Sequence, residues 1–222
     1  ATAGQALAAA LKRFKGNRNT LIVALPRGGV PVAAEVARSL GAPLDVGVVR
    51  KIGAPGHTEL ACGAIAADGS TVWNERVLFS LGITQSELRL DRENALREAK
   101  QLEQNLRTSL TPPLPAFAKT VIVVDDGLAT GATMKAALKA LLLQKPHKIL
   151  VAVPVGPEDT CSEIEEMGYE IVCPKRLPSG ELSSVGEWYD DFSQVESGTC
   201  RKLLEESRSR SATEEAATLS AS

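Results

Sequence analysis

The chain has 222 residues, of which 44% are hydrophobic, and its formal net charge at pH 7 is −2. This length and apolar content predict one domain with a full core, and the slightly acidic balance argues against a general nucleic-acid-binding surface. The four cysteines form no CxxC pair and have no nearby histidine spacing, which argues against a zinc site or a disulfide framework, and no apolar run approaches the roughly 20 residues of a membrane span.

The N-terminal part predicts a helix and then two buried strands. Residues 1–15 place leucines and a phenylalanine at helical spacing, which predicts a helix packed on a sheet. Residues 20–25 indicate a buried strand, followed by a helix from about 32 to 40 that ends at Gly41. Residues 44–49 predict the next buried strand.

The turn after the first strand has the sequence PRGGVP and contains Arg27, Gly28 and Gly29. Its two glycines allow the backbone N–H groups to be exposed, and the guanidinium of Arg27 can bind a phosphate bidentately. The pattern predicts a phosphate-binding turn, with an ordinary tight turn and a solvated arginine as the alternative.

Two adjacent cations, Arg50 and Lys51, follow the strand at 44–49. They open a loop rich in glycine and proline that we expect to be mobile. Such a pair can stabilise an anionic group that reaches this edge of the sheet.

The next stretch predicts a hairpin and a long helix. Residues 60–73 predict the hairpin, with its turn at the Asp-Gly pair of 68–69. Residues 84–109 predict the helix, with Thr84 as N-cap and Glu87 completing a capping box. Its charged faces indicate contact with solvent.

Residues 121–133, VIVVDDGLATGAT, carry the most specific signal in the chain. Four β-branched residues predict a buried parallel strand, and Asp125 and Asp126 follow where it ends. The small-residue loop leads into a helix, whose unpaired N–H groups and dipole favour an anion. No lysine follows the glycine as in a P-loop, which excludes that class of ATPase. Carboxylates beside an anion site suit hydroxyl groups or a metal on the same ligand, as in a sugar phosphate with a free diol.

The C-terminal half completes the alternation of strands and helices. Residues 148–155 and 169–173 predict two more strands, with a helix at about 158–167 between them. The whole pattern predicts an α/β fold, a Rossmann-like parallel sheet with helices on both faces, and ligands at the carboxyl ends of its strands.

An aromatic cluster follows in a chain that has few aromatic residues. Trp188, Tyr189 and Phe192 could stack on a planar acceptor or pack as a hydrophobic lid on the core. From about Glu205 the composition is rich in Ser, Glu, Arg and Ala, which predicts a disordered tail over 205–222.

The segment 121–133 resembles the PRPP-binding motif of type I phosphoribosyltransferases, where PRPP is 5-phosphoribosyl-1-pyrophosphate. The resemblance extends over roughly 18–195 through the stretches PRGGVP, VVRKIGAPG, VDDGLATG and EWYDDFSQV. With these stretches the chain resembles a branch of predicted phosphoribosyltransferases whose acceptor is unassigned. It implies the type I phosphoribosyltransferase fold as a single domain over 1–204, with a small hood subdomain from about 53–110 and 174–195.

The resemblance implies a role for each motif. Asp125 and Asp126 would bind the ribose hydroxyls, and a cis peptide bond is expected next to Arg27. Mg²⁺ would arrive with PRPP, held by the two aspartates only through water. The 5′-phosphate of PRPP would be bound by Gly127, Leu128, Ala129, Thr130, Gly131, Ala132 and Thr133. Pyrophosphate would be bound by Arg27, Gly28, Gly29, Arg50 and Lys51. The catalytic residues would be Arg50, Lys51 and Asp126, and the acceptor would meet Trp188 and Tyr189.

The implied reaction transfers ribose 5-phosphate from PRPP to an unidentified acceptor and releases pyrophosphate. Family members that use 6-oxopurines carry an acid where Ala129 stands, which leaves orotate-like, uracil-like or non-nucleobase acceptors open. A non-catalytic protein that senses PRPP or a nucleotide is the alternative, although Arg27 favours catalysis. Hydrolysis of a phosphorylated sugar is a third reading, with His57 or Glu59 as the nearest bases.

The expected partners are therefore PRPP and a small acceptor, with no nucleic acid, and the fold class suggests a homodimer. We expect a cytoplasmic location with reduced thiols. The chain begins at Ala1 without a methionine, so removal of a transit segment and an organellar location stay open.

Overall fold

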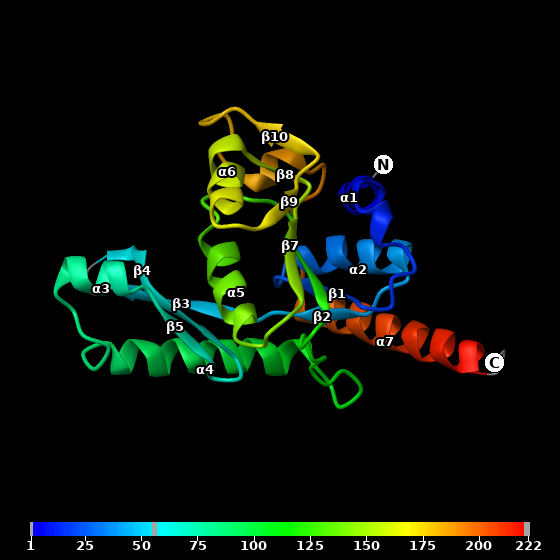
Figure 1. Ribbon diagram of the computed structural model, residues 1–222, viewed down its shortest axis with the longest axis horizontal. Helices are drawn as coiled ribbons and strands as arrows, with labels where there is room; N and C mark the ends of the chain where they lie inside the picture. Colours follow the sequence, from blue (N-terminus) through cyan, green and yellow to red (C-terminus); the bar gives the residue numbers. More distant parts are fainter. Residues whose placement is uncertain (1, 55–56, 220–222) are drawn as a thin grey trace.

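The computed structural model describes residues 2–54 and 57–219, and only the backbone of residues 57–60 and 214–219. Its centre is a five-stranded sheet in the order β2-β1-β6-β7-β9, and every neighbouring pair of strands is parallel (Figure 1). The expected α/β fold is confirmed. These strands are β1 (Thr20–Ala24), β2 (Leu44–Val46), β6 (Thr120–Val124), β7 (Lys148–Ala152) and β9 (Glu170–Val172).

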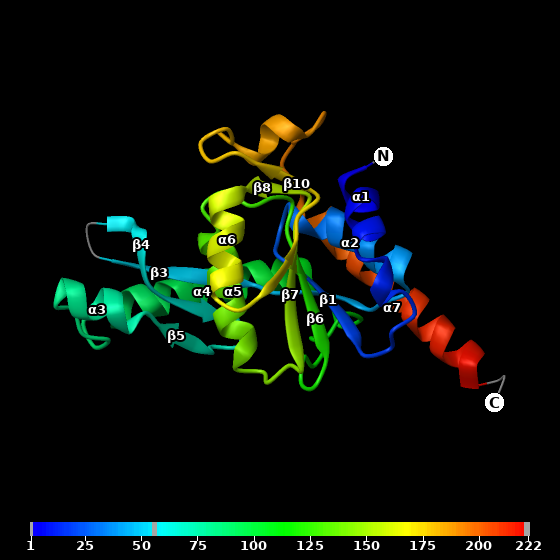
Figure 2. The same cartoon turned by 45° about the horizontal axis from the view of Figure 1, so that its top comes forward.

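Helices cover both faces of this sheet (Figure 2). Because successive side chains of a strand point to opposite faces, Ile122 and Val124 join one core, while Val121 and Val123 join the other. The first core is closed by α1 (Ala3–Ala10), the short η1 (Lys12–Phe14), α2 (Gly29–Leu40) and α7 (Ser197–Leu219); the second is closed by α5 (Ala132–Leu142) and α6 (Glu158–Glu166).

A second sheet extends from the parallel sheet to the left of Figure 1, and we call it and its helices the arm. Its three antiparallel strands lie in the order β3-β4-β5, and its own core contains Ile52, Ile65 and Leu88. The arm consists of β3 (Val49–Ala54), β4 (His57–Ala66), β5 (Thr71–Trp73), α3 (Glu75–Leu81) and α4 (Arg89–Leu106).

A third, two-stranded sheet lies above the parallel sheet in Figure 1, beside α6. It pairs β8 (Val155–Pro157) with β10 (Lys175–Leu177), and η2 (Val185–Trp188) follows. Among the described residues, no helix is both long and apolar enough to cross a membrane.

The strand predicted at 44–49 is two strands that belong to different sheets. The chain leaves the parallel sheet at Gly47, where a Cβ atom would lie 2.9 Å from a methyl carbon of Val23. Arg50 and Lys51 therefore lie inside β3 and do not open a loop. The hairpin turn at 68–69 is confirmed, since the N–H of Gly69 bonds the carbonyl of Ala66 at 2.9 Å.

The helix predicted from Thr84 begins at Arg89. The capping-box contacts do form, because the backbone N–H of Thr84 donates to Glu87 Oε2 at 2.8 Å and the N–H of Glu87 donates to Thr84 Oγ1 at 3.4 Å. They close a separate turn before the helix, so the local signal was correct and its assignment to the helix start was wrong.

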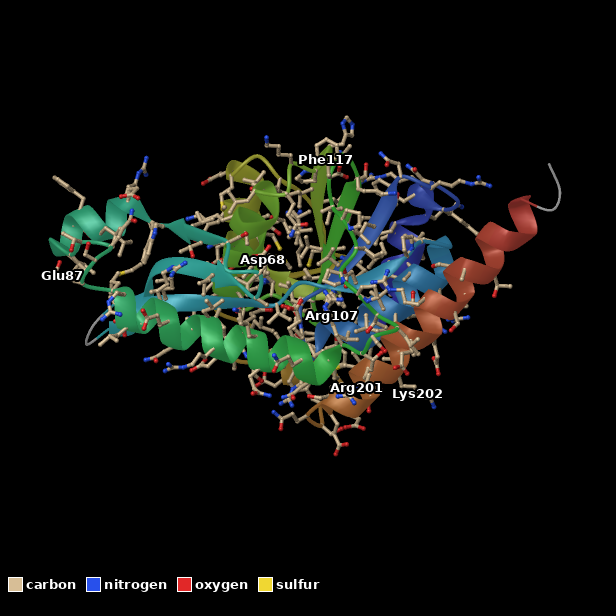
Figure 3. All side chains as sticks on the ribbon, turned by 90° about the horizontal axis from the view of Figure 1, so that it is seen from below. Asp68, Glu87, Arg107, Phe117, Arg201 and Lys202 are labelled. Atoms are coloured by element: carbon tan, nitrogen blue, oxygen red, sulfur yellow. The ribbon has the colours of Figure 1, made fainter. Side chains whose placement is uncertain are left out.

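The disordered tail expected from Glu205 is also wrong over 205–219, where α7 continues. Its polar residues find partners far away in the sequence: Thr108 Oγ1 donates to Glu205 at 2.9 Å, and Arg208 donates to the carbonyl of Pro112 at 2.9 Å. Figure 3 shows the start of α7 beside the end of α4, near the labelled Arg201 and Arg107. Composition alone does not reveal such partners.

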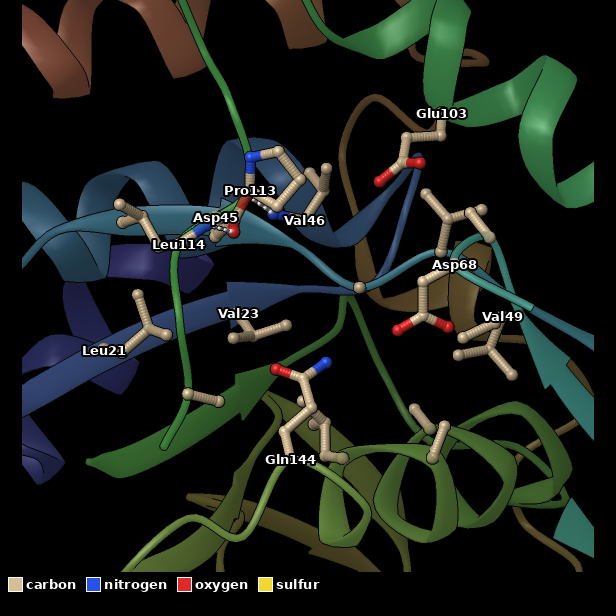
Figure 4. A pocket seen from close by; sticks show the side chains of 18 of the residues that line it. Leu21, Val23, Asp45, Val46, Val49, Asp68, Glu103, Pro113, Leu114 and Gln144 are labelled. Atoms are coloured by element: carbon tan, nitrogen blue, oxygen red, sulfur yellow. Dashed lines mark hydrogen bonds between the residues drawn. The ribbon is translucent and has the colours of Figure 1, made fainter. Parts of the chain in front are cut away.

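A cavity of about 140 Å³ lies between β2, β3 and α5, with the buried Asp45 at its edge (Figure 4). The carboxylate of Asp45 accepts hydrogen bonds from the N–H groups of Val46 (2.8 Å) and Leu114 (2.7 Å). It also pairs with Arg107 at 2.6 Å. These contacts balance the negative charge of Asp45 within the protein. They also connect β2 to the end of α4 and to the segment before β6.

Candidate active site

The site is built at the carboxyl ends of β1 and β6, which are neighbours in the middle of the sheet. The two strands are in register, with Ala24 opposite Val124. Leu25, the residue after β1, donates its N–H to the carbonyl of Val124 at 2.8 Å. The PRGGVP turn and the Asp125-Asp126 pair therefore leave the sheet side by side, as parallel strands require.

The glycines of the turn touch the aspartates directly. A Cβ atom at Gly28 would lie 1.8 Å from Asp126 Oδ2, and one at Gly29 would lie 2.9 Å from the Cα of Asp125. Only glycine permits this approach of the two loops. The peptide bond between Pro26 and Arg27 is cis, as expected.

The acid pair is held in an environment that disfavours its charge. Burial raises the pKa of Asp125 well above its ordinary value, and the neighbouring Asp126 carboxylate adds to the effect. Burial also raises the pKa of Asp126, although bonds from the side chain of Asp125 and from backbone N–H groups oppose this. Ligand hydroxyl groups or a cation would relieve the repulsion.

The carboxylate oxygens are of the kind that Mg²⁺ prefers. Within the part of the chain that the structure describes, no group of three or more His, Cys, Asp or Glu residues is placed to hold a metal ion. A magnesium ion here would therefore need most of its ligands from a substrate and water.

The loop at 127–133 surrounds a cavity of about 260 Å³ at the start of α5. Gly131 has a left-handed backbone with φ +69° and offers no side chain as a cap, while Thr130 Oγ1 accepts a hydrogen bond from the N–H of Ala132 at 3.4 Å. Three exposed residues line this cavity: Ala129, Thr130 and Thr133. Their hydroxyl and backbone N–H groups are donors that suit an anion. Leu128 differs, because its side chain is buried and its N–H bonds the carbonyl of Val155 at 2.9 Å. It anchors the loop.

Lys135 lies beside the loop at 127–133 without lining either cavity of the site, and sequence reasoning did not consider it. Its Nζ lies 3.5 Å from the carbonyl oxygen of Thr130 and forms an ion pair with Glu163. It stands one helical turn after Gly131, and this spacing at the start of α5 could have identified it.

A second cavity, of about 770 Å³, adjoins the acid pair and carries the cations. Arg27, Gly28 and Asp126 line it on one side, and Arg50 reaches it from β3. Arg50 also lies 3.7 Å from Glu98 of α4. Lys51 is the next residue of β3, so its side chain leaves the opposite face of the strand, and it is not among the residues lining either cavity.

Residues 185–195, which we call the cover segment, lie over the acid pair. A Cβ atom at Gly127 would lie 2.5 Å from a methyl carbon of Val185, so this valine packs directly on the loop at 127–133, which we call the phosphate loop after the role predicted for it. The hydroxyl of Tyr189 donates to the carbonyl of Asp126 at 2.6 Å. The ring of Phe192 lies 5.4 Å from that of Tyr189 and lines both cavities.

The two residues expected to meet an acceptor are separated in the structure. Tyr189 lines the larger cavity, whereas Trp188 lies beneath Lys175, with the Nζ atom 4.5 Å from its ring centre. Of the predicted hood, residues 185–195 lie over the acid pair, and most of the part at 53–110 belongs to the arm, which contributes Leu102 to the larger cavity. The side chains of His57 and Glu59, the bases considered for hydrolysis, lie outside the described residues.

Comparison with known proteins adds to this geometry. The family model described as the phosphoribosyl transferase domain matches residues 2–187. A provisionally named phosphoribosyl transferase of Mycobacterium tuberculosis, from strains H37Rv and CDC 1551, is 39% identical over 194 residues, which cover 87% of this chain and 43% of the relative. The chain thus spans less than half the length of these curated relatives. The crystal structure of TT1426 from Thermus thermophilus superposes with a TM-score of 0.83 at 35% identity, covering 92% of this chain and 95% of that one.

Proposed function

The chain belongs to the phosphoribosyl transferase family, and we propose that it transfers ribose 5-phosphate from PRPP to an acceptor with release of pyrophosphate. One observation carries the proposal: the turn with Arg27 and Gly28 and the loop at 127–133 line two adjoining cavities that meet at Asp126, with Gly28 against Asp126. A diol, a phosphate and a pyrophosphate of one molecule would each find a suitable partner there.

The phosphate loop would hold the 5′-phosphate. The N–H groups of the first turn of α5 and the hydroxyls of Thr130 and Thr133 are suitable donors, and a bound phosphate would take over the N–H of Ala132 from Thr130 Oγ1. Asp125 and Asp126 would then accept hydrogen bonds from the ribose hydroxyls. This contact would lower the raised pKa of both carboxyl groups, since hydroxyl donors stabilise the charged form.

Arg27 and Arg50 would hold the pyrophosphate in the larger cavity. In the reaction, the bond between the ribose anomeric carbon and the pyrophosphate oxygen breaks, and a bond to the acceptor nucleophile forms. The guanidinium groups would stabilise the charge that develops on the leaving oxygen. Mg²⁺ bound with the substrate would supply further neutralisation of the pyrophosphate charge.

The cover segment would position the reactants and limit the access of water. Val185 and Phe192 close one side of the phosphate loop, and Tyr189 fixes the segment to Asp126. Holding the sugar and the acceptor in a set geometry, with water excluded, favours transfer over hydrolysis. The absence of a carboxylate at Ala129 makes orotate-like, uracil-like and non-nucleobase acceptors the first to test.

The test measures pyrophosphate release from PRPP and Mg²⁺ across a panel of nucleobases and small amines, together with calorimetric binding of PRPP. Asp126→Asn is the test variant, and Glu206→Gln, which removes an exposed carboxylate of α7, is the matched control. Release that depends on one acceptor and is lost only in the Asp126 variant would establish the transferase. Tight PRPP binding without release would favour a sensor, and no binding would overturn the proposal.

A further inference from the structure

The cavity of about 140 Å³ beside Asp45 is a pocket in the second core, separate from the candidate active site. Among the described residues, none lines both this cavity and a cavity of the active site. Part of its inner wall is made by the buried side chains of Leu21 and Val23 from β1 and of Val49 from β3. The inside of this pocket therefore suits an apolar group.

One face of α5 forms another wall of this cavity. Ala137, Ala140 and Leu141 line it, and their spacing of i, i+3 and i+4 places them on the same side of the helix. The two alanines leave room that a larger side chain would fill. An apolar cavity of about 150 Å³ can hold a molecule the size of benzene. The pocket is therefore large enough for an apolar body of about one ring.

The mouth of the cavity is polar. Figure 4 shows Asp68, Glu103 and Gln144 pointing toward the same space, from the turn before β5, from α4 and from the end of α5. Asp68 Oδ1 accepts a hydrogen bond from the N–H of Ser70 at 2.8 Å, and Glu103 Oε1 accepts one from Nε of Arg107 at 2.9 Å. Because an ionised carboxylate offers about four lone-pair positions on its two oxygens, both groups can accept further bonds from a ligand.

The charged groups at the cavity carry an excess of negative charge. Among the described residues of its lining, Asp45, Asp68 and Glu103 are acidic and Arg107 is basic. Arg208, outside the lining, lies 3.6 Å from Asp45, so that two guanidinium groups accompany three carboxylates and leave a net charge of −1. Both arginines lie at Asp45, and the excess therefore falls at the mouth. A ligand with one positive charge would balance it.

We propose that this cavity binds a small organic cation, with an apolar body of about one ring against β1 and α5 and a protonated amine at the mouth. The amine donates hydrogen bonds to the carboxylates of Asp68 and Glu103 and to the side-chain oxygen of Gln144. Such bonds between charged groups are stronger than those of a neutral donor, so the site prefers an amine to an alcohol of the same shape. The site is independent of the proposed function, because PRPP would bind in other cavities.

The experiment measures the binding of benzylamine to the full chain by calorimetry at neutral pH, where this amine is protonated. Benzyl alcohol is the uncharged probe of the same shape. Methyl NMR locates the bound molecule, because Leu141 lines this cavity and Val185 lines the cavity of the phosphate loop. Shifts at Leu141 report the proposed site, whereas shifts at Val185 alone report an amine at the acid pair.

Two variants separate the apolar body from the charge. Ala140→Leu fills the apolar part of the cavity. Asp68→Ser removes a carboxylate of the mouth and keeps an oxygen that can accept the N–H of Ser70, so the turn is preserved. Glu206→Gln, which removes an exposed carboxylate of α7, is the matched control for the loss of charge.

The expected result is saturable benzylamine binding with a Kd on the order of 1 mM, with shifts at Leu141, and binding of benzyl alcohol at least about threefold weaker. Ala140→Leu weakens benzylamine binding at least about tenfold, because its side chain occupies the place of the ring. Asp68→Ser weakens it about two- to fivefold, the range of an exposed ion pair, and Glu206→Gln leaves it unchanged.

Three results would overturn the proposal: no saturable shift at Leu141, benzyl alcohol that binds as tightly as benzylamine, or unchanged benzylamine binding in Asp68→Ser. Unchanged binding in a folded Ala140→Leu would overturn it as well. Should that variant fail to fold, the two probes and Asp68→Ser decide the outcome.

Discussion

Tyr189 is tied to Asp126 by a hydrogen bond of 2.6 Å from its hydroxyl to the backbone carbonyl. The two residues are 63 positions apart in the sequence, so this bond fixes the cover segment to the acid pair. Burial and the nearby carboxylates raise the pKa of Tyr189, which keeps its hydroxyl protonated as a donor.

Replacing Tyr189 by phenylalanine tests this connection. The ring keeps its packing against Phe192, but the carbonyl of Asp126 loses its donor. We expect a loss of about 1 kcal/mol in the free energy of unfolding, which lowers Tm by about 2–4 °C in a domain of this size. Tyr169→Phe, at the edge of the second core, is the control. An unchanged Tm in thermal denaturation would contradict the structural role of the bond.

Substituting Gly28 by alanine tests the contact between the turn and the acid pair. The backbone at Gly28 is ordinary for any residue, with φ −58° and ψ −36°, so only the clash of the new methyl group with Asp126 matters. We expect a loss of PRPP binding of at least about tenfold, since misplaced groups of a site lose affinity steeply. Gly198→Ala, where nothing lies within 4 Å, is the matched control and should bind normally.

The centre of the candidate site could be predicted from the sequence because its signals are local. Asp125 and Asp126 follow a run of β-branched residues, and glycines follow them, so strand, carboxylates and anion loop can be predicted from adjacent residues. The meeting of this loop with Arg27 follows from the rule that parallel strands end at one edge of the sheet.

The structure departs from the expectations where long-range pairing decides it. Lys51 was expected beside Arg50, but β3 pairs with β4, and alternation along the strand separates the two side chains. The helix over 205–219 depends on partners such as Pro112, which local composition does not reveal. The hydrogen bond from Tyr189 to Asp126 also joins distant parts of the chain, and no spacing in the sequence indicates it.

The two cations of β3 should differ in their effect on activity. Arg50 lines the larger cavity, whereas Lys51 leaves the other face of the strand. We expect Arg50→Ala to lower kcat/KM for PRPP by about 10- to 100-fold, in keeping with the roughly 1.5–3 kcal/mol of a hydrogen bond to a charged group. Lys51→Ala should change kcat/KM for PRPP by less than about threefold, because its side chain leaves the other face of β3. Equal losses in steady-state kinetics would show that both cations act on the substrate.

The Asp45–Arg107 pair should dominate the stability of the junction between β2 and α4. Its side chains are only 6% and 11% exposed, so removing Arg107 leaves a buried carboxylate unpaired. We expect Arg107→Met to cost about 3–5 kcal/mol, with Arg208, 3.6 Å from Asp45, offsetting part of the loss. The double variant with Asp45→Asn should recover much of it in urea denaturation, and a double variant as unstable as the single would contradict the pairing.

Asp125 should lower the stability of the empty protein at neutral pH. Its pKa is raised in the folded state by burial and by Asp126, so the folded protein binds this proton more tightly than the unfolded chain does. The stability that this proton provides is present at low pH and is lost as the pH rises through the raised pKa.

Asp125→Asn removes the buried charge and can still accept the 2.9 Å bond from the N–H of Asp126. We expect Tm to rise by about 2–4 °C at about pH 7.5, equivalent to roughly 1 kcal/mol, and the gain to shrink as the pH is lowered towards about 4.5. Binding of PRPP should be lost, because the amide replaces a carboxylate acceptor for the ribose hydroxyls. A variant that is more stable yet does not bind would mark Asp125 as a group retained for its ligand, since selection then favours binding over stability. A lower Tm at neutral pH, or a gain that does not depend on pH, would contradict the raised pKa as its cause.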